Sequence, residues 1–407
     1  MIRPGVCLCP ICGCASDRPF YAADVTTDAG WLKKTADQGY YVESFDSAKK
    51  IYHLPDPDAP AADDGWPDEV EVCLNDSGSD TVSMRRCCPD CFAGKVDNKS
   101  VKTYFKHFVG RVPLFVVAVI GTKSAGKTAW LGALSSGALG PLNRQDYPYK
   151  AFPSKPGDVV EVSRSTIKVG DKGNSNYIEI WDKNRRGGKP VAMVLVMDAA
   201  GENYKKFAIE DIFEANVTVD SPVRRLVYGD GPLNPGIDGA ILIDPAVHGK
   251  TAENTVTLFN GMIDKLRTVP VAYVYTYADE LIYTEKKRME KNKPPLLTWD
   301  TFPNTTYTGE HISILKEHFR PEKIRERMII QEEIAQTVQM PGYNYILMNC
   351  ANSCHGFIVR SCKPIPASGD KEQENDYTEQ FNVADPLLWM LAQLRLFPLQ
   401  IKKGGAL

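Results

Sequence analysis

The segment V-V-A-V-I-G-T-K-S-A-G-K-T-A-W, residues 116–130, decides the fold of this chain. The apolar run at residues 114–120 predicts a buried strand, and the amphipathic stretch at residues 129–139 predicts a helix. Between them stands the pattern G-x-x-x-x-G-K-T, whose glycines let backbone N–H groups turn inward while the helix N-terminus adds positive potential. The segment therefore predicts a phosphate-binding loop in an α/β domain, with a mostly parallel sheet flanked by helices.

Each residue of this loop is a candidate ligand of a nucleotide. Lys127 would reach the β and γ phosphates, and Thr128 would place its hydroxyl on Mg²⁺. The alternative is a glycine-containing turn with a lysine at a helix start, but the flanking strand and helix favour the phosphate loop. The candidate nucleotide-binding residues are Gly121, Thr122, Lys123, Ser124, Ala125, Gly126, Lys127 and Thr128.

Length and charge set the class of protein. A chain of 407 residues is longer than one ordinary domain, so we expect one large α/β domain with a smaller appended module. A net charge of −3 and a pI near 6.1 argue against a protein whose main task is to coat nucleic acid. The sequence has no apolar run long enough for a membrane span and no apolar signal-peptide core at residues 1–20, so we expect a cytoplasmic location.

Most of the cysteines lie in the first part of the chain, before residue 92, which in a reducing compartment favours metal binding over disulfides. Two pairs, C-P-I-C and C-P-D-C, have the spacing that presents two thiolates each to one tetrahedral Zn²⁺. Because the pairs are far apart in sequence, the metal would close a long loop and contribute folding energy. The predicted zinc ligands are Cys9, Cys12, Cys88 and Cys91.

We interpret residues 1–111 as a zinc-ribbon-like module that ends in a linker helix at residues 92–111. Its insert is acidic and proline-rich at residues 55–69, which favours protein contact or scaffolding over nucleic-acid binding. Further thiols leave a second metal site open. Its candidate ligands are Cys7, Cys14 and Cys87, completed by Cys73 or His53.

A predicted hairpin precedes the second motif of the large domain. Apolar runs at residues 177–180 and 190–197 are separated by a turn-rich segment, which predicts two antiparallel strands. The second run ends in D-A-A-G-E, residues 198–202, where the aspartate and the glycine could serve Mg²⁺ and a γ-phosphate. Residues 140–162 have no hydrophobic period and occupy the position of a switch loop.

The second half of the chain predicts a continuation of the same sheet. One strand ends in T-Y-A-D, residues 276–279, and a later one ends in N-C-A-N-S, residues 349–353. Between them, residues 281–341 are interpreted as a helical insertion that either contacts a partner or packs on its own sheet. The predicted elements are strands at residues 238–244, 269–279 and 345–348, and helices at residues 251–266, 321–340 and 387–396, the last with Asp385 as its N-cap.

In this order, the loop, D-A-A-G-E, T-Y-A-D and N-C-A-N-S resemble the motifs of a translation-factor-type P-loop GTPase domain, here at residues 112–407. The cysteine pairs, D-x-A-G-E and the A-D-P-L-L-W ending look like the bacterial double-GTPase family, whose members are often encoded within multi-gene conflict systems. The resemblance implies binding of GTP and GDP with Mg²⁺, a zinc ion in the amino-terminal module, and protein partners.

The resemblance also implies roles at the phosphates for Lys127, Asp198, Gly201 and Glu202. Asp198 would hold Mg²⁺ through water, and the Gly201 N–H would meet the γ-phosphate. Glu202 stands where Ras-like enzymes place the glutamine that orients the attacking water. Hydrolysis would therefore be slow, stimulated by a partner, or organised by another residue.

The same resemblance implies a base site. Asp279 would accept hydrogen bonds from guanine N1–H and the exocyclic amine, and Thr276 begins the same motif. Tyr277 replaces the usual lysine and could cover the base with its ring. Alternatively, Asp279 caps the next helix. Cys350 and Ala351 would place loop backbone over the guanine carbonyl.

Three other functions remain open from the sequence. A P-loop ATPase that acts on nucleic acid through the zinc module usually has an apolar strand followed by Asp-Glu, whereas the runs before the second motif and at residues 238–244 end in Asp198-Ala199 and Asp244-Pro245. A dynamin-like GTPase would need long helical stalks. A nucleotide-dependent scaffold that does not hydrolyse would account for Glu202. We expect guanine nucleotide and protein partners, and we expect neither nucleic acid nor membrane as a partner.

Overall fold

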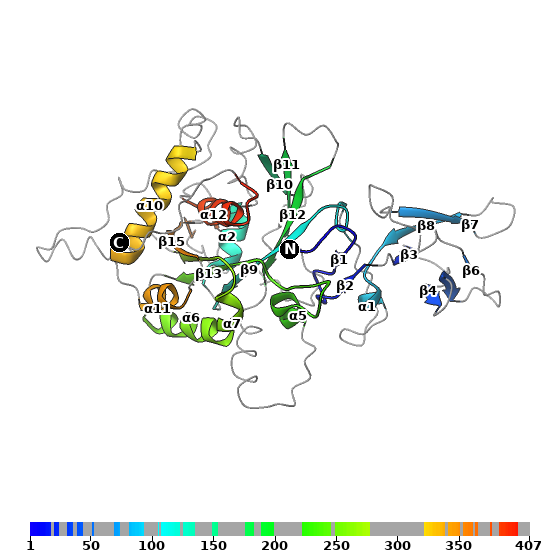
Figure 1. Cartoon of the computed structure of the whole chain (residues 1–407), viewed down its shortest axis with the longest axis horizontal. Helices are drawn as coiled ribbons and strands as arrows, with labels where there is room; N and C mark the ends of the chain where they lie inside the picture. The colour runs from blue at the N-terminus through cyan, green and yellow to red at the C-terminus, as the bar shows by residue number, and fades with distance from the viewer. Residues whose placement is uncertain are drawn as a thin grey trace, which may run out of the picture. The chain divides into compact units, whose positions relative to one another are not determined.

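The computed structural model has two compact units (Figure 1). The first consists mainly of Met1–Leu114 and Asp220–Gly236, and the second contains Phe115–Val169, Gly173–Val219 and Ile237–Leu407. A stretch from the middle of the sequence thus folds with the amino-terminal module. The structure describes residues 1–17, 20–23, 31–35, 39–43, 51–52, 69–73, 81–92, 105, 107–122, 125–134, 149–153, 176–182, 189–198, 222–245, 249–276, 321–337, 341–350, 353–360, 363–364, 375–376 and 382–397.

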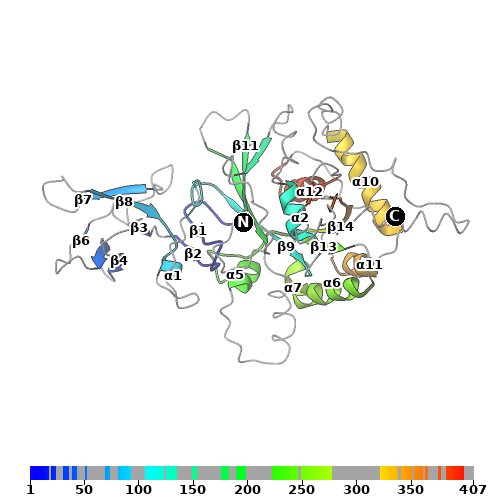
Figure 2. The ribbon, with the colours of Figure 1, turned by 180° about the vertical axis from the view of Figure 1, so that it is seen from behind.

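A seven-stranded sheet forms the centre of the second unit (Figures 1 and 2). Its strands are β9 Leu114–Gly121, β10 Tyr149–Pro153, β11 Asn176–Asp182, β12 Ala192–Asp198, β13 Gly239–Pro245, β14 Val271–Thr276 and β15 Cys354–Ile358. Their order across the sheet is β10-β11-β12-β9-β13-β14-β15. Strands β9, β13, β14 and β15 are mutually parallel, whereas β10, β11 and β12 pair antiparallel. The fold is therefore α/β, as predicted.

The apolar runs located most of these strands correctly, because strands covered on both faces are nearly continuous in hydrophobicity. The predicted hairpin is confirmed, with Ile178 paired to Val194 across β11 and β12. Strand β10 was not predicted and lies within residues 140–162, where we expected a loop. It pairs with β11 at the edge of the sheet. A separate small sheet pairs β16 Lys363–Pro364 with β17 Asn375–Asp376.

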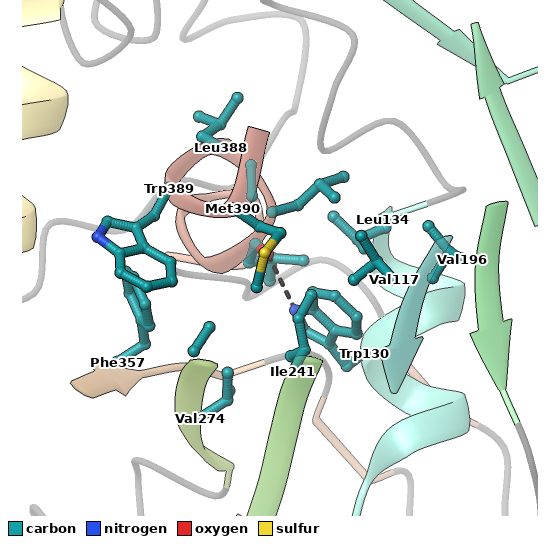
Figure 3. Packing of buried hydrophobic residues seen from close by; sticks show 14 of the residues in the cluster. Val117, Trp130, Leu134, Val196, Ile241, Val274, Phe357, Leu388, Trp389 and Met390 are labelled. Atoms are coloured by element: carbon teal, nitrogen blue, oxygen red, sulfur yellow. Dashed lines mark hydrogen bonds between the residues drawn. The ribbon is translucent and has the colours of Figure 1, made fainter. Parts of the chain in front are cut away.

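Three helices pack on one face of the sheet with apolar side chains (Figure 3). They are α2 Lys127–Ala133, α10 Pro321–Thr337 and α12 Asp385–Gln393. Trp130 is fully buried in the same apolar cluster as Val117, Ile241 and Val274, and its indole Nε1 donates to the Val383 carbonyl at 3.0 Å. A large apolar side chain buried in this way stabilises the fold by about 1.5–3 kcal/mol.

Helix α10, from the predicted insertion, packs on its own sheet, with Met328 in the core. Its Arg327 makes a bidentate pair with Asp385, with Nη2–Oδ1 at 2.8 Å and Nε–Oδ2 at 3.1 Å. Gln331 donates a further hydrogen bond to the same carboxylate at 2.9 Å. The predicted N-cap role of Asp385 is wrong, because Ala384 occupies the N-cap position and the Asp385 carboxylate is directed to α10. This buried pair ties the closing helix to the insertion.

Helices α6 Gly249–Gly261, α7 Ile263–Leu266 and α11 Pro341–Asn349 lie on the opposite face (Figure 1). The strand predicted at residues 345–348 is wrong, because these residues belong to α11. Tyr343 and Ile346 are both fully buried and three positions apart, a helical spacing that a short apolar run does not reveal. Among the described helices, none is both long and apolar enough to cross a membrane.

Small antiparallel sheets make up the first unit, in the pairings β1-β2, β3-β8-β7 and β4-β5-β6. Its elements are β1 Cys7–Leu8, β2 Ala15–Ser16, β3 Tyr21–Ala23, β4 Trp31–Thr35, β5 Gly39–Glu43, β6 Ile51–Tyr52, β7 Glu69–Cys73, β8 Thr81–Arg86, α1 Pro89–Phe92 and α5 Pro222–Tyr228. Helix α5 comes from the middle of the sequence and belongs to this unit.

The linker helix expected at residues 92–111 is wrong at its carboxyl end. Phe108 and Gly110 have φ values of 69° and 80°, and turns occupy this segment. Gly110 lies so close to the amino terminus that a Cβ there would come within 2.7 Å of Cys7 Sγ. The Gly5 N–H donates to the Gly110 carbonyl at 2.7 Å, so contacts with the chain start decide this path.

Candidate functional site

The loop between β9 and α2 requires glycine at both glycine positions of the pattern. A Cβ on Gly121 would approach the Ile243 carbonyl oxygen to 2.6 Å, because β13 lies directly beside it. Gly126 has a φ of 89°, in the left-handed region, and a Cβ there would meet Thr276 at 3.3 Å. The predicted strand and helix start are therefore present, and at Gly121 and Gly126 the backbone takes paths that a side chain would block.

Lys127 lies across this loop and is 4% exposed. Its Nζ donates to the carbonyls of Gly121 at 2.8 Å and Thr122 at 3.0 Å. These are neutral acceptors, so the loop holds a buried ammonium on its own backbone oxygens. The first N–H groups of an α-helix lack intrahelical acceptors, which adds positive potential at the same point. The Lys127 ammonium and the first N–H groups of α2 thus lie close together, and both would attract an anion.

Thr276, the last residue of β14 and the first of T-Y-A-D, contacts this loop. Its Oγ1 donates to the Ala125 carbonyl at 2.7 Å, and its side chain packs against Gly126. Thr276 is 3% exposed, so it positions the loop and is not open to a ligand. The sequence placed Thr276 among nucleotide-binding residues, and its observed contacts are with the loop itself.

The second motif begins at the end of the strand next to the loop's own strand. Asp198 is the last residue of β12, and β12 lies beside β9 in the sheet. The order of the strands thus brings the D-A-A-G-E strand and the loop strand together. Several predicted site residues lie outside the described part of the chain. They are Lys123, Ser124, Gly201, Glu202, Asp279 and Ala351.

The structure separates Cys350 from the loop. Cys350 comes before β15, which runs parallel to β14, so it lies at the amino ends of the parallel strands. The loop follows β9 at their carboxyl ends. The sequence predicts that Cys350 belongs to the base site because it predicts a strand directly before it. Helix α11 stands there instead, so this basis for the prediction is lost. Val359 and Arg360 directly follow β15, so they lie at the carboxyl ends of the parallel strands, as the loop after β9 does.

A buried carboxylate that the sequence left without a role lies on the α6 face of β13. Asp244 accepts hydrogen bonds from Tyr273 and, at 2.9 Å, from Thr255 of α6. Burial raises the pKa of Asp244, and these two hydrogen bonds oppose that shift. Tyr273 in turn packs on Tyr343 of α11, with ring centroids 5.5 Å apart. Asp244 therefore connects the sheet to its covering helices.

Four buried cysteines form a candidate metal site in the first unit. Their Sγ atoms all lie within 4.8 Å of one another, with 3.7 Å between Cys9 and Cys91 and 3.4 Å between Cys12 and Cys88. Zn–S bonds of about 2.3 Å in a tetrahedron place sulfur atoms roughly 3.8 Å apart, so the four thiolates suit a metal ion such as zinc. Burial raises the pKa of Cys9, and a bound cation would reverse this penalty on the thiolate.

The first cysteine pair lies on a tight backbone turn. The Cys9 N–H donates to the Cys14 carbonyl at 2.9 Å, and the Gly13 N–H donates to the Cys9 carbonyl at 3.0 Å. Gly13 has a φ of 74°, which this reversal requires. We call residues 9–14 the cysteine turn. It aims two thiols at the second pair, on and beside α1.

Two of the spare thiols contact arginines. Arg86 Nη1 lies 3.5 Å from Cys7 Sγ, and Arg225 Nη1 lies 2.7 Å from Cys14 Sγ. Among the described side chains, the four-cysteine cluster is the one group with metal-ligand geometry. His53 and the side chain of Cys73, which were needed for the second site, lie outside the described part.

Comparison of the chain with protein-family models and with curated protein sequences finds no match.

Proposed function

We propose that this protein binds GTP and GDP with Mg²⁺ and hydrolyses GTP as a molecular switch, with a structural zinc ion in its amino-terminal unit. The observation that carries the proposal is the loop between β9 and α2, where Lys127 is buried on the carbonyls of Gly121 and Thr122. Phosphate is the ligand class that such a loop, lysine and helix start suit best.

Lys127, Thr128 and Asp198 have different roles in the proposed nucleotide site. Lys127 leaves its two carbonyl acceptors and donates to the β and γ phosphates. Thr128, in the first turn of α2, offers its hydroxyl to Mg²⁺, and Asp198 at the end of the adjacent strand acts through a water. Mg²⁺ supplies neutralisation of the charge that develops on the phosphate oxygens.

The arrangement of acidic residues favours a GTPase over the ATPase alternative. An ATPase of another P-loop branch could draw its metal-binding aspartate from β13, which ends in Asp244 and Pro245. Asp244 is 3% exposed and already accepts hydrogen bonds from Tyr273 and Thr255. Asp198, on the other neighbour of β9, is left as the candidate, as the hairpin and D-A-A-G-E also suggest.

Base selection is assigned to Asp279 on the resemblance of T-Y-A-D to a guanine motif. The contact between Thr276 and Ala125 supports this placement, because it connects the start of the motif to the phosphate loop. Glu202 in place of a glutamine makes slow or partner-stimulated hydrolysis the expected behaviour. A protein partner of a multi-gene bacterial system is the proposed source of that stimulation.

A competition titration with fluorescent GDP tests the proposal. We expect GTP and GDP to compete in Mg²⁺ far better than ATP does, and Lys127→Ala to weaken binding by about 100-fold or more, because the phosphates lose their charged donor. Lys323→Ala is the matched control, since this exposed lysine pairs only weakly with Glu326 on α10. Equal affinity for ATP and GTP would contradict the guanine assignment.

Single-turnover hydrolysis at high protein concentration then separates a switch from a scaffold that does not hydrolyse. Phosphate release above the buffer rate, lost in Lys127→Ala, supports the switch. Tight GTP binding without any release, with and without co-encoded proteins, would support the scaffold.

A further inference from the structure

The connection between β12 and β13 contains a segment that folds with the other unit. Strand β12 ends at Asp198 and β13 begins at Gly239, both in the second unit, but Asp220–Gly236 belongs to the first. The same connection begins with D-A-A-G-E. Contacts that fix Asp220–Gly236 therefore fix the carboxyl-terminal part of the connection that follows D-A-A-G-E.

Helix α5 and the turn after it bind the cysteine turn directly. Arg225 of α5 donates from Nη1 to Cys14 Sγ at 2.7 Å. Asn234 Nδ2 donates to the Gly13 carbonyl at 3.0 Å and to the Arg225 carbonyl at 2.9 Å. Asn234 is 1% exposed, so these bonds form away from water, where loss of a partner is costly. Two side chains of the segment thus contact two adjacent residues of the cysteine turn.

The segment itself is a compact unit that presents Asn234. The Gly236 N–H donates to Asn234 Oδ1 at 3.1 Å. Gly229 and Gly236 have φ values of 86° and 83°, and a Cβ on either would come within 2.3 Å of backbone oxygen. Leu226 is fully buried, so α5 also has an apolar anchor. The backbone after α5 has little freedom to accommodate a different cysteine turn.

The cysteine turn is also where two of the four metal ligands reside. Cys12 immediately precedes Gly13 and Cys14, the residues that Asn234 and Arg225 contact. A metal ion held by Cys9 and Cys12 would fix the backbone of this turn, and with it the position of the Gly13 carbonyl. A metal-free turn whose thiols separate would move both acceptors away from the segment.

We propose that the metal-loaded cysteine turn is the anchor of Pro222–Gly236, so that metal occupancy and the conformation of this segment are energetically coupled. The coupling to nucleotide rests on the proposed function, whereas the anchor itself does not. Coupling is reciprocal: if bound zinc changes the affinity for a nucleotide by some factor, that nucleotide changes the affinity for zinc by the same factor. Arg225 and Asn234 are positioning residues in this arrangement.

Hydrogen exchange of the full-length protein tests the anchor without any nucleotide. We expect removal of zinc with a chelator to raise amide exchange in residues 222–236 by about tenfold or more, as a local opening would, while α12 keeps its protection. Arg225→Ala should reproduce part of this increase with zinc bound, and Arg224→Ala is the matched control, because Arg224 lies over the Tyr228 ring. Unchanged protection of residues 222–236 after verified zinc loss would overturn the anchor.

Equilibrium competition for zinc with a metallochromic chelator tests the coupling. With the nucleotide affinities measured on the same samples, we expect the zinc affinities of the GTP-analogue and GDP forms to differ by about fivefold in the wild type and in Arg224→Ala. The difference should vanish in Arg225→Ala and Asn234→Ala. Equal zinc affinities in a wild type that binds both nucleotides would overturn the coupling.

The two proposals fail in different ways. If neither guanine nucleotide binds, the proposed function fails, and the exchange experiment alone decides the anchor. If either variant does not fold, the comparison of zinc-loaded and zinc-free wild type still decides it.

Discussion

The loop between β9 and α2 and the cysteine turn at residues 9–14 have similar backbone turns, but different groups occupy their centres. Each reverses the backbone at a glycine with positive φ, Gly126 at 89° and Gly13 at 74°. The loop is filled by the Lys127 ammonium on backbone carbonyls, so the chain itself satisfies its centre. The cysteine turn directs two thiols at two others, and burial raises the pKa of Cys9.

This difference predicts opposite dependence on ligand. Because Lys127 donates to backbone carbonyls of its own loop, the loop should keep its conformation when no anion is bound. A centre of four buried thiols is stabilised by a cation, because ionised sulfur is unfavourable in an apolar environment without one. Loss of nucleotide should therefore leave the second unit folded, whereas loss of metal should weaken the first.

The largest effect is expected from Cys88→Ser. Loss of one thiolate should abolish binding of the metal, and structural zinc contributes on the order of 10 kcal/mol in small metal-binding domains. Metal content by mass spectrometry should fall to background, and thermal unfolding of the first unit should lose its cooperativity. Cys350→Ser is the control, since this buried cysteine is in the second unit. If Cys88→Ser keeps its zinc and unfolds like the wild type, the first unit does not depend on a metal held by the four cysteines.

A smaller effect, confined to nucleotide binding, is expected from Gly126→Ala. The left-handed conformation costs a side chain about 1–2 kcal/mol, and the added Cβ would press on Thr276. Guanine nucleotide affinity in a fluorescence titration should fall by about 100-fold, corresponding to 2.7 kcal/mol, with zinc content unchanged. Wild-type affinity in this variant would show that the loop path is unimportant for binding.

The smallest effect is expected from Thr276→Val, which removes one hydroxyl at nearly constant volume. The Ala125 carbonyl would lose its donor, at a cost of about 1–3 kcal/mol. Nucleotide affinity should fall by roughly tenfold, while Thr276→Ser, which keeps the hydroxyl, should bind nearly as wild type. If the two variants behave alike, the hydrogen bond does not position the loop.

Local pattern was sufficient where a signal depends on near neighbours. The strand before Gly121, the hairpin ending at Asp198 and the helix beginning at Pro321 all follow from hydrophobic runs and turn residues. The two C-x-x-C pairs likewise predicted a four-thiol site from spacing alone, because tetrahedral metal geometry restricts which ligands can share an ion.

Local pattern failed where distant contacts decide. Residues 345–348 are apolar enough for a strand, but burial of Tyr343 and Ile346 on one side makes them helical. Asp385 has the sequence context of an N-cap, yet Arg327 and Gln331 of a distant helix take its carboxylate. In both cases the competing conformations are similar in local energy, so tertiary contacts choose between them.

By itself, the sequence determined the α/β class, the strand before Gly121 and the helix start after Gly126, and the four cysteines with metal-ligand spacing, because each depends on residues close together or on fixed ligand spacing. Only the tertiary structure decided that Lys127 is held on backbone carbonyls, that Cys350 is at the far end of the sheet, and that Pro222–Gly236 binds the cysteine turn. These features join residues far apart in sequence, and no local pattern records which distant partner will offer the better buried contact.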